Sequence, residues 1–192
     1  SQKEMPKQFI DFFGSGRTLL QQTFDRFVRF IPIQHIFVST FEDYVPLVHS
    51  QLPELPEANI LPEPVQLNTA PAAIWGTWHA VVSPADQIIQ HEETFEQQIL
   101  HGLDYVNTHA DFLAMGVKPT QPNTAYGYIQ MGDEVDEKDM FKVQSFSEKP
   151  ELNYARLFLE SGEFLWNTGI FLWKGETMGR HLSEMAHRPD QP

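Results

Sequence analysis

Cysteine is absent from this sequence of 192 residues. A chain without thiols forms neither a disulfide framework nor a thiolate zinc site. Basic residues are also scarce, because 13 lysines and arginines stand against 26 aspartates and glutamates, for a formal net charge of −13. Nucleic acids attract basic surfaces, so this balance argues against a nucleic-acid partner. A small anionic substrate would need a local cationic site or a bound metal ion.

Long apolar runs are missing as well. No segment approaches the ~18 consecutive apolar residues of a membrane-spanning helix, and no signal peptide is recognisable. The sequence contains no Gly-x-Ser-x-Gly nucleophile elbow and no intact glycine-rich phosphate loop. Its eight histidines are scattered along the chain and suggest no metal site. The expectation is therefore a cytoplasmic enzyme or ligand-binding domain without a membrane partner.

Segments with strand-like and helix-like patterns alternate along the chain. Residues 18–29 carry apolar side chains at helical spacing behind Thr18, a candidate N-cap, and Gly162 is placed to end a helix over residues 153–161. This alternation predicts an α/β fold of three layers with a mixed, mostly parallel sheet. With 41% hydrophobic residues, the length suits a single domain over residues 1–192.

Charged residues follow two of the predicted strands. Asp86 lies at the end of residues 81–86, which are expected to form a buried strand ending in a turn, and Glu148 and Lys149 come after a strand at residues 142–146. Ligands of open α/β sheets bind beyond the carboxyl ends of the strands, so these side chains are expected to converge. Adjacent residues of an extended chain point in opposite directions, so one of the pair could contact a sugar hydroxyl and the other a phosphate. The competing interpretation is a capping aspartate and a solvated charged turn.

Four further positions are candidates for ligand contacts. Lys7 could meet a phosphate, Asn68 could cap a helix whose free N–H groups bind a base edge or an anion, and Gly127 allows close approach of backbone to a ligand. Asn167 lies between aromatic, apolar flanks in residues 164–171, where a buried polar ligand could be held. In isolation, an exposed lysine is the better explanation of Lys7 and an ordinary loop explains Gly127, while Asn68 could cap a helix and bind a ligand at once.

Taken together and in order, these pieces resemble the sugar nucleotidyltransferases, and among them the mannose-1-phosphate guanylyltransferases (GDP-mannose pyrophosphorylases). The resemblance covers nearly the whole chain. No single motif is decisive, but seven in register are specific. The segments that carry it are residues 6–9, 17–23, 63–64 with 68–71, 83–87, 118–120 with 126–129, 146–150 and 164–171.

The resemblance implies a Rossmann-like nucleotidyltransferase domain that makes GDP-mannose and pyrophosphate from GTP and mannose 1-phosphate with Mg²⁺. It implies that Asp86 holds the metal, and that Lys7 and Lys149 neutralise phosphate groups. Guanine would lie against residues 68–71, which are Asn68, Thr69, Ala70 and Pro71. The sugar side of the site would comprise Tyr126, Gly127, Glu148 and Asn167, with Glu148 on the hydroxyls of mannose. A homodimer is expected.

The chain departs from the family pattern in several places. The glycine-rich loop of the form Gly-Gly-x-Gly-x-Arg is expected before Ser1 and is absent, and a second metal-binding aspartate is expected beyond Pro192. Ala85 and Gln87 replace the serine and histidine of the more usual Pro-Ser-Asp-His pattern, and Ala125 stands where glycine is common. These substitutions spare the carboxylate of Asp86.

Three alternatives stay open at this point. The chain could belong to a non-catalytic paralogue that senses a sugar nucleotide and regulates a partner. It could carry out the same reaction with another nucleotide and another sugar 1-phosphate. It could also be one half of a bifunctional chain in which an isomerase domain follows.

Overall fold

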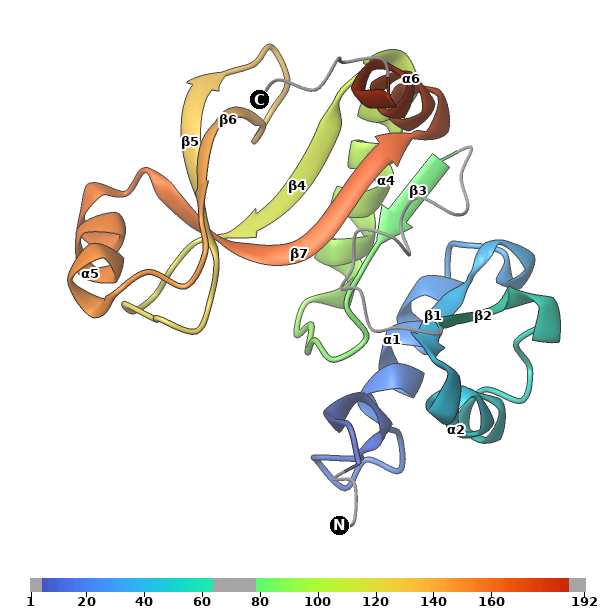
Figure 1. Cartoon of the computed structure of the whole chain (residues 1–192). Helices are drawn as coiled ribbons and strands as arrows, with labels where there is room; N and C mark the ends of the chain where they lie inside the picture. Colours follow the sequence, from blue (N-terminus) through green and yellow to red (C-terminus); the bar gives the residue numbers. More distant parts are fainter. Residues whose placement is uncertain (1–4, 64–78, 187–192) are drawn as a thin grey trace. The chain divides into compact units, whose positions relative to one another are not determined.

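The computed structural model describes residues 5–63 and 79–186, and the chain divides into two compact units (Figure 1). The first unit comprises Ser1–Asp111 and Trp173–Pro192, and the second comprises Phe112–Leu172. Within the described ranges, no helix combines the length and apolar character needed to cross a membrane. The single nucleotidyltransferase domain expected over the whole chain stays a prediction.

The first unit combines helices with short strands. Strands β1 and β2 pair in parallel, from Val38 opposite Ile60 to Phe41 opposite Glu63. Short 3-10 turns lie before α1, at Lys7–Phe9, and between the later elements, at Ile33–His35, Glu42–Tyr44 and Glu57–Asn59. The longer elements are α1 (Leu19–Val28), β1 (Val38–Phe41), α2 (Val45–Gln51), β2 (Ile60–Glu63), β3 (His79–Val82), α4 (Glu92–Thr108) and α6 (Gly175–Ala186).

Helix α1 begins with the cap predicted from the sequence. The Gln21 N–H donates to Thr18 Oγ1 at 3.3 Å, and the Thr18 N–H donates to Gln21 Oε1 at 3.0 Å, which completes a capping box. Gln51, at the end of α2, accepts from the Thr18 hydroxyl at 2.7 Å and donates through Nε2 to the Phe9 carbonyl at 3.0 Å. This one glutamine therefore ties the turn that carries Lys7 to both helices.

A hydrophobic core lies beneath that turn. Phe9 is 4% exposed, and a fully buried aromatic side chain contributes about 1.5–3 kcal/mol to folding. Because Phe9 is fixed in the core, the adjacent backbone at Lys7 has a defined position. The core consists of Phe9, Leu20, Phe24, Val48, Leu52, Leu55 and Ile60, with Ala85 among the residues packed against it.

A buried arginine connects α1 with α4. The Arg26 side chain is 3% exposed, its Nε lies 3.5 Å from Glu92 Oε1, and its guanidinium lies 5.7 Å from the centroid of the Phe95 ring. Burial lowers the pKa of the Arg26 guanidinium from its ordinary value, and the negative charge of Glu92 opposes that change. A cation in this position depends on its carboxylate partner, because an unpaired buried charge is costly.

The second unit is a sheet with one covering helix. Strand β5 pairs antiparallel with β6, where Tyr128 lies opposite Ser147, and antiparallel with β7, where Tyr128 lies opposite Trp166. Strand β4 pairs with β7. Helix α5 ends at the predicted Gly162, whose φ of 71° is in the left-handed region. The elements are β4 (Phe112–Val117), β5 (Tyr128–Glu134), β6 (Phe141–Ser147), α5 (Leu152–Ser161) and β7 (Phe164–Lys174), the last two residues of which belong to the first unit.

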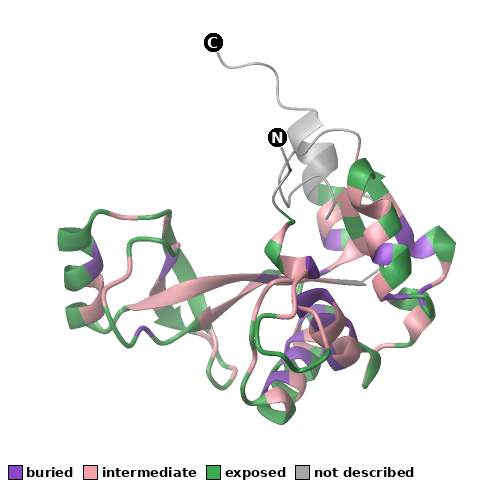
Figure 2. Ribbon diagram, turned by 90° about the horizontal axis from the view of Figure 1, so that it is seen from below, coloured by how far each residue is buried: buried purple, intermediate pink, exposed green. Residues whose placement is uncertain are grey.

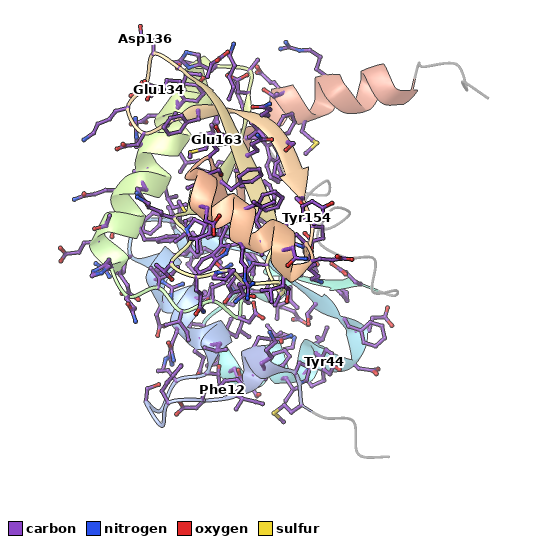
Figure 3. All side chains as sticks on the ribbon, turned by 90° about the vertical axis from the view of Figure 1, so that its left-hand side faces the viewer. Phe12, Tyr44, Glu134, Asp136, Tyr154 and Glu163 are labelled. Carbon is purple, nitrogen blue, oxygen red and sulfur yellow. The ribbon has the colours of Figure 1, made fainter. Side chains whose placement is uncertain are left out.

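The predicted α/β class is confirmed, and the pairing is mixed. Strands β1 and β2 are parallel, whereas β5 forms antiparallel pairs. A short connection between β5 and β6 favours this antiparallel hairpin, since parallel neighbours need a long crossover. Glu134 and Asp136 mark this connection in Figure 3, and Figure 2 shows β6 exposed along most of its length.

Candidate functional site

In the first unit, the structure brings together two of the predicted site residues. Lys7 Nζ lies 3.0 Å from Asp86 Oδ2, with the lysine side chain 70% exposed and the aspartate side chain 33% exposed. Lys7 begins the turn fixed by Phe9, and Asp86 follows β3 and adjoins Ala85, which packs against the core. An ion pair this exposed stabilises a fold by about 0–1 kcal/mol. Its importance is chemical, because it places a cation and a carboxylate next to each other.

Asp86 offers one carboxylate to a metal ion. Across the described part of the chain, no group of three or more His, Cys, Asp or Glu side chains is arranged to hold a metal. This donor set suits Mg²⁺, which usually binds one or two carboxylates, substrate phosphates and water rather than an all-protein cage. The partly exposed Asp86 carboxylate, already beside a cation, fits such a role.

The predicted guanine-binding residues Asn68, Thr69, Ala70 and Pro71 lie outside the described residues. Their role stays a prediction. The expected convergence of Asp86 with Glu148 and Lys149 also stays a prediction.

In the second unit, three predicted site residues meet at Gly127. The Asn167 N–H donates to the Gly127 carbonyl at 2.8 Å. A Cβ on Gly127 would lie 2.7 Å from Glu148 Oε2, 3.5 Å from Asn167 Cβ and 3.7 Å from Asn167 Nδ2. The glycine therefore leaves room for the carboxylate and the amide to approach the same point. We call Gly127, Glu148 and Asn167 the amide–carboxylate cluster.

A buried tyrosine fixes the loop before this cluster. Tyr128 is fully buried, and its hydroxyl accepts from the Asn123 N–H at 3.0 Å and donates to the Asn123 carbonyl at 2.9 Å. The predicted site residue Tyr126 lies between these anchors, 47% exposed, with its ring 5.1 Å from that of Trp166 in an edge-on arrangement. The loop thus presents an aromatic side chain and Gly127 from a fixed backbone.

Lys149 adjoins the cluster in a rare backbone conformation. Its φ is 45°, in the left-handed region, and a non-glycine residue there costs on the order of 1–3 kcal/mol. The expectation that Glu148 and Lys149 point in opposite directions is wrong, because the chain turns at Lys149 instead of staying extended. Lys149 Nζ lies 3.7 Å from Glu148 Oε1, and both side chains are about two-thirds exposed. A carboxylate and an ammonium are therefore presented together.

The sequence interpretation overlooked the residues that support Asn167. The Thr168 hydroxyl donates to the Met115 carbonyl on β4 at 2.7 Å, and Gly169 has a φ of 72° within β7. The sequence signal that could have revealed this support was Gly169, because a glycine inside a strand often marks a bulge or a close approach of another backbone.

The two groups of residues, each described within its own unit, offer different chemistry. Lys7 and Asp86 supply a cation and a metal-binding carboxylate, which fit a polyphosphate with its metal ion. The amide–carboxylate cluster supplies a donor and acceptors for hydroxyl groups, and Lys149 adds a charge for a phosphate.

The chain is similar to several curated proteins named mannose-1-phosphate guanylyltransferase. The mannose-1-phosphate guanylyltransferase of Salmonella montevideo is 36% identical over 199 residues, which cover 96% of this chain and 41% of that protein. One from Escherichia coli is 35% identical over 204 residues, which cover 99% of this chain and 42% of that protein. The chain thus spans about two fifths of the length of these curated relatives.

Solved structures show the same fold. A Thermus thermophilus protein, described as mannose-1-phosphate geranyltransferase, superposes with a TM-score of 0.83 at 27% identity, over 94% of this chain and 54% of that one. A Helicobacter pylori protein, described as mannose-6-phosphate isomerase, superposes with a TM-score of 0.79 at 24% identity, over 93% of this chain and 70% of that one, and supports the fold alone. The model of the nucleotidyl transferase family matches residues 2–187. The chain therefore belongs to the nucleotidyl transferase family.

Proposed function

We propose that the protein of which this chain is part forms GDP-mannose and pyrophosphate from GTP and mannose 1-phosphate, with Mg²⁺ as cofactor. The observation that carries the proposal is the amide–carboxylate cluster with Lys149 beside it, because this set matches a sugar bearing a phosphate. The choice of mannose and guanine is supported by the relatives, which are mannose-1-phosphate guanylyltransferases.

In this reaction, a phosphate oxygen of mannose 1-phosphate attacks the α-phosphorus of GTP. A new P–O bond forms, the bond from the α-phosphorus to the bridging oxygen of the β-phosphate breaks, and pyrophosphate leaves. Phosphoryl transfer asks little covalent chemistry of a protein, so positioning and neutralisation of charge supply most of the rate.

The residues of this chain have distinct tasks in the proposed reaction. Lys7 neutralises the triphosphate, and Lys149 neutralises the phosphate of the sugar. The amide–carboxylate cluster binds sugar hydroxyls, so that the attacking oxygen is held in one orientation. Asp86 would hold Mg²⁺, which when bound offsets the negative charge of the phosphates.

The test is pyrophosphate release by the full-length protein, with GTP and mannose 1-phosphate as substrates. In parallel control assays, GTP is replaced by ATP, CTP or UTP, or mannose 1-phosphate is replaced by glucose 1-phosphate. We expect turnover to be highest with GTP and mannose 1-phosphate. Turnover that favours another pair would overturn the substrate assignment within the same reaction class. Binding without turnover of any pair would favour a regulatory sugar-nucleotide sensor.

The role of Asp86 is tested by Asp86→Asn, which keeps the shape of the side chain and removes its charge. Loss of a metal clamp worth about 3 kcal/mol lowers turnover at least about a hundredfold. The melting temperature is expected to stay close to that of the wild type, since the ion pair with Lys7 is exposed. Wild-type turnover in this variant would exclude a metal-binding role.

A further inference from the structure

Strand β7 contains a break in its regular geometry at residues 167–169. Gly169 has a φ of 72° inside the strand Phe164–Lys174, in the left-handed region that glycine also adopts at β-bulges, and we call residues 167–169 the bulge. Before the bulge, β7 pairs with β5, with Trp166 opposite Tyr128 and the Asn167 N–H bound to the Gly127 carbonyl. The break therefore begins directly after the backbone contact that anchors Asn167.

The side chains of this segment satisfy the backbone groups that the bulge displaces. The Gly169 N–H donates to Asn167 Oδ1 at 2.9 Å, and the Ile170 N–H donates to Thr168 Oγ1 at 3.2 Å. The Thr168 hydroxyl in turn donates to the Met115 carbonyl at 2.7 Å. Asparagine and threonine commonly bind the N–H group two residues further on in this way. The segment is thus locked by hydrogen bonds at both side chains.

These bonds determine which end of the Asn167 amide is available. A backbone N–H can only donate, so the atom facing Gly169 must be the amide oxygen. The amide nitrogen Nδ2 then faces elsewhere, 3.7 Å from the position of a Cβ on Gly127. It has no hydrogen-bond partner among the residues that the structure describes. Asn167 consequently presents two N–H donors on the side where Glu148 presents acceptors.

We propose that Gly169 is a positioning residue, which through its left-handed backbone holds the Asn167 amide with Nδ2 directed at the sugar. This inference rests on the proposed function. Glu148 then accepts hydrogen bonds from sugar hydroxyls, and Asn167 donates to a hydroxyl oxygen. The Asn167 NH2 group can only donate and the Glu148 carboxylate can only accept, so together they fix the direction of the hydrogen bonds to the sugar. A sugar that lacks the hydroxyl between these two groups would leave them unpaired and would therefore bind less well.

Three variants separate the orientation of the amide from the stability of the fold. Gly169→Val disfavours a positive φ because the side chain is β-branched, whereas Gly169→Asn tolerates the left-handed region. Asn167→Asp keeps an oxygen acceptor for the Gly169 N–H but replaces the donors by a charged oxygen beside Glu148. Thermal melting of each variant accompanies the measurements below.

The first measurement uses the full-length protein without ligand. In the wild type, ¹⁵N relaxation of the Asn167 side-chain amide is expected to show the rigidity of the neighbouring backbone. In Gly169→Val this amide should become mobile, and in Gly169→Asn it should stay rigid. A mobile amide in the wild type would overturn the inference whatever the protein catalyses.

The second measurement is the steady-state KM for mannose 1-phosphate and for GTP. The loss of one oriented hydrogen bond corresponds to about a three- to tenfold rise in the KM for mannose 1-phosphate. We expect that rise in Gly169→Val and at least as large a rise in Asn167→Asp. Gly169→Asn should stay within about twofold of the wild type, and the KM for GTP should change little.

The outcomes distinguish this inference from the proposed function. Equal rises in both KM values, or a fall in kcat alone, would indicate a general structural effect and overturn the inference. KM values for Gly169→Val that equal those of the wild type would also overturn the inference. A rigid wild-type amide together with no binding of any sugar 1-phosphate would instead overturn the proposed function, and with it the ligand assigned to Nδ2.

Discussion

The Lys7 ammonium and the Asp86 carboxylate are 3.0 Å apart, so the residue proposed to neutralise phosphate contacts the residue proposed to hold Mg²⁺. In the chain without substrate, the ammonium and a metal ion would therefore compete for the same carboxylate. A triphosphate offers Lys7 a more highly charged partner and brings phosphate oxygens for the metal. The Lys7–Asp86 ion pair therefore favours binding of the metal ion together with the nucleotide rather than before it.

Replacing the ammonium makes this competition measurable. Lys7→Met should strengthen binding of Mn²⁺ to the nucleotide-free protein, because Asp86 loses its competing cation. An exposed ion pair is worth about 0.2–1 kcal/mol, which corresponds to a gain of up to about fivefold. The affinity for GTP should fall, since a phosphate contact is lost. Electron paramagnetic resonance of free Mn²⁺ at low ionic strength gives the metal affinity directly.

Lys138→Met is the matched control for this prediction. It removes the same charge from a side chain that is 87% exposed and whose ion pair is with its neighbour Asp139. Any general effect of making the protein more negative would appear in both variants. Equal Mn²⁺ affinities in the two variants would show that Lys7 does not compete for Asp86.

Gly127 is expected to control the position of Glu148. A Cβ at residue 127 would lie 2.7 Å from Glu148 Oε2, which is shorter than real contacts allow. Because the Glu148 side chain is 71% exposed, it can swing away at little cost to stability. Gly127→Ala should therefore raise the KM for the sugar 1-phosphate about tenfold, through the loss of one charged hydrogen bond of about 1.5 kcal/mol. Its melting temperature should change little.

Gly179→Ala provides the comparison for that variant. Gly179 lies in α6, and a Cβ there would have no atom within 4 Å apart from its own helix and chain neighbours. Alanine in a helix interior is favoured over glycine by roughly 0.5–1 kcal/mol, so this variant should be stabilised with unchanged kinetics. Equal kinetic changes in both variants would mean that Glu148 does not depend on the room at Gly127.

Local patterns made much of the fold predictable. The N-cap at Thr18 and the end of α5 at Gly162 each depend on a few consecutive residues, and the sequence predicts both. The α/β class follows from the alternation of periodic segments, which is also a local property. Of the candidate site, the position of Asp86 near the end of a buried strand was recognisable from the local pattern, whereas Lys7 had no such signal, and the roles of both residues stay predictions.

Features that depend on distant residues were not predictable in the same way. Burial of Arg26 requires α4 to supply Glu92, which lies far along the chain from α1. The left-handed conformation of Lys149 contradicts the ordinary preference of lysine, so local propensity indicated an extended residue. Strain of this kind is tolerated where surrounding contacts over-determine the backbone, as is common at functional sites.

That strain leads to a prediction about stability and affinity. Lys149→Gly removes both the ammonium and the cost of the positive φ, whereas Lys149→Met removes the ammonium and keeps the strain. Both variants should lose affinity for the sugar 1-phosphate to the same extent. Lys149→Gly should also be more stable than Lys149→Met by about 1 kcal/mol in urea denaturation. If Lys149→Gly is the less stable of the two, the backbone at this position carries no strain.

The buried Arg26 gives the sharpest prediction about the first unit. Glu92→Gln leaves the guanidinium, 3% exposed, without a charged partner, and should lower the free energy of unfolding by about 1–3 kcal/mol. The lower part of that range applies because Glu92 is itself 41% exposed. Glu96→Gln is the control, since Glu96 pairs at 3.6 Å with the exposed Arg29, which Glu92 also contacts at 2.9 Å, and loss of such an exposed pair should cost at most about 1 kcal/mol. Equal costs in urea denaturation would show that Glu92 does not stabilise the buried charge.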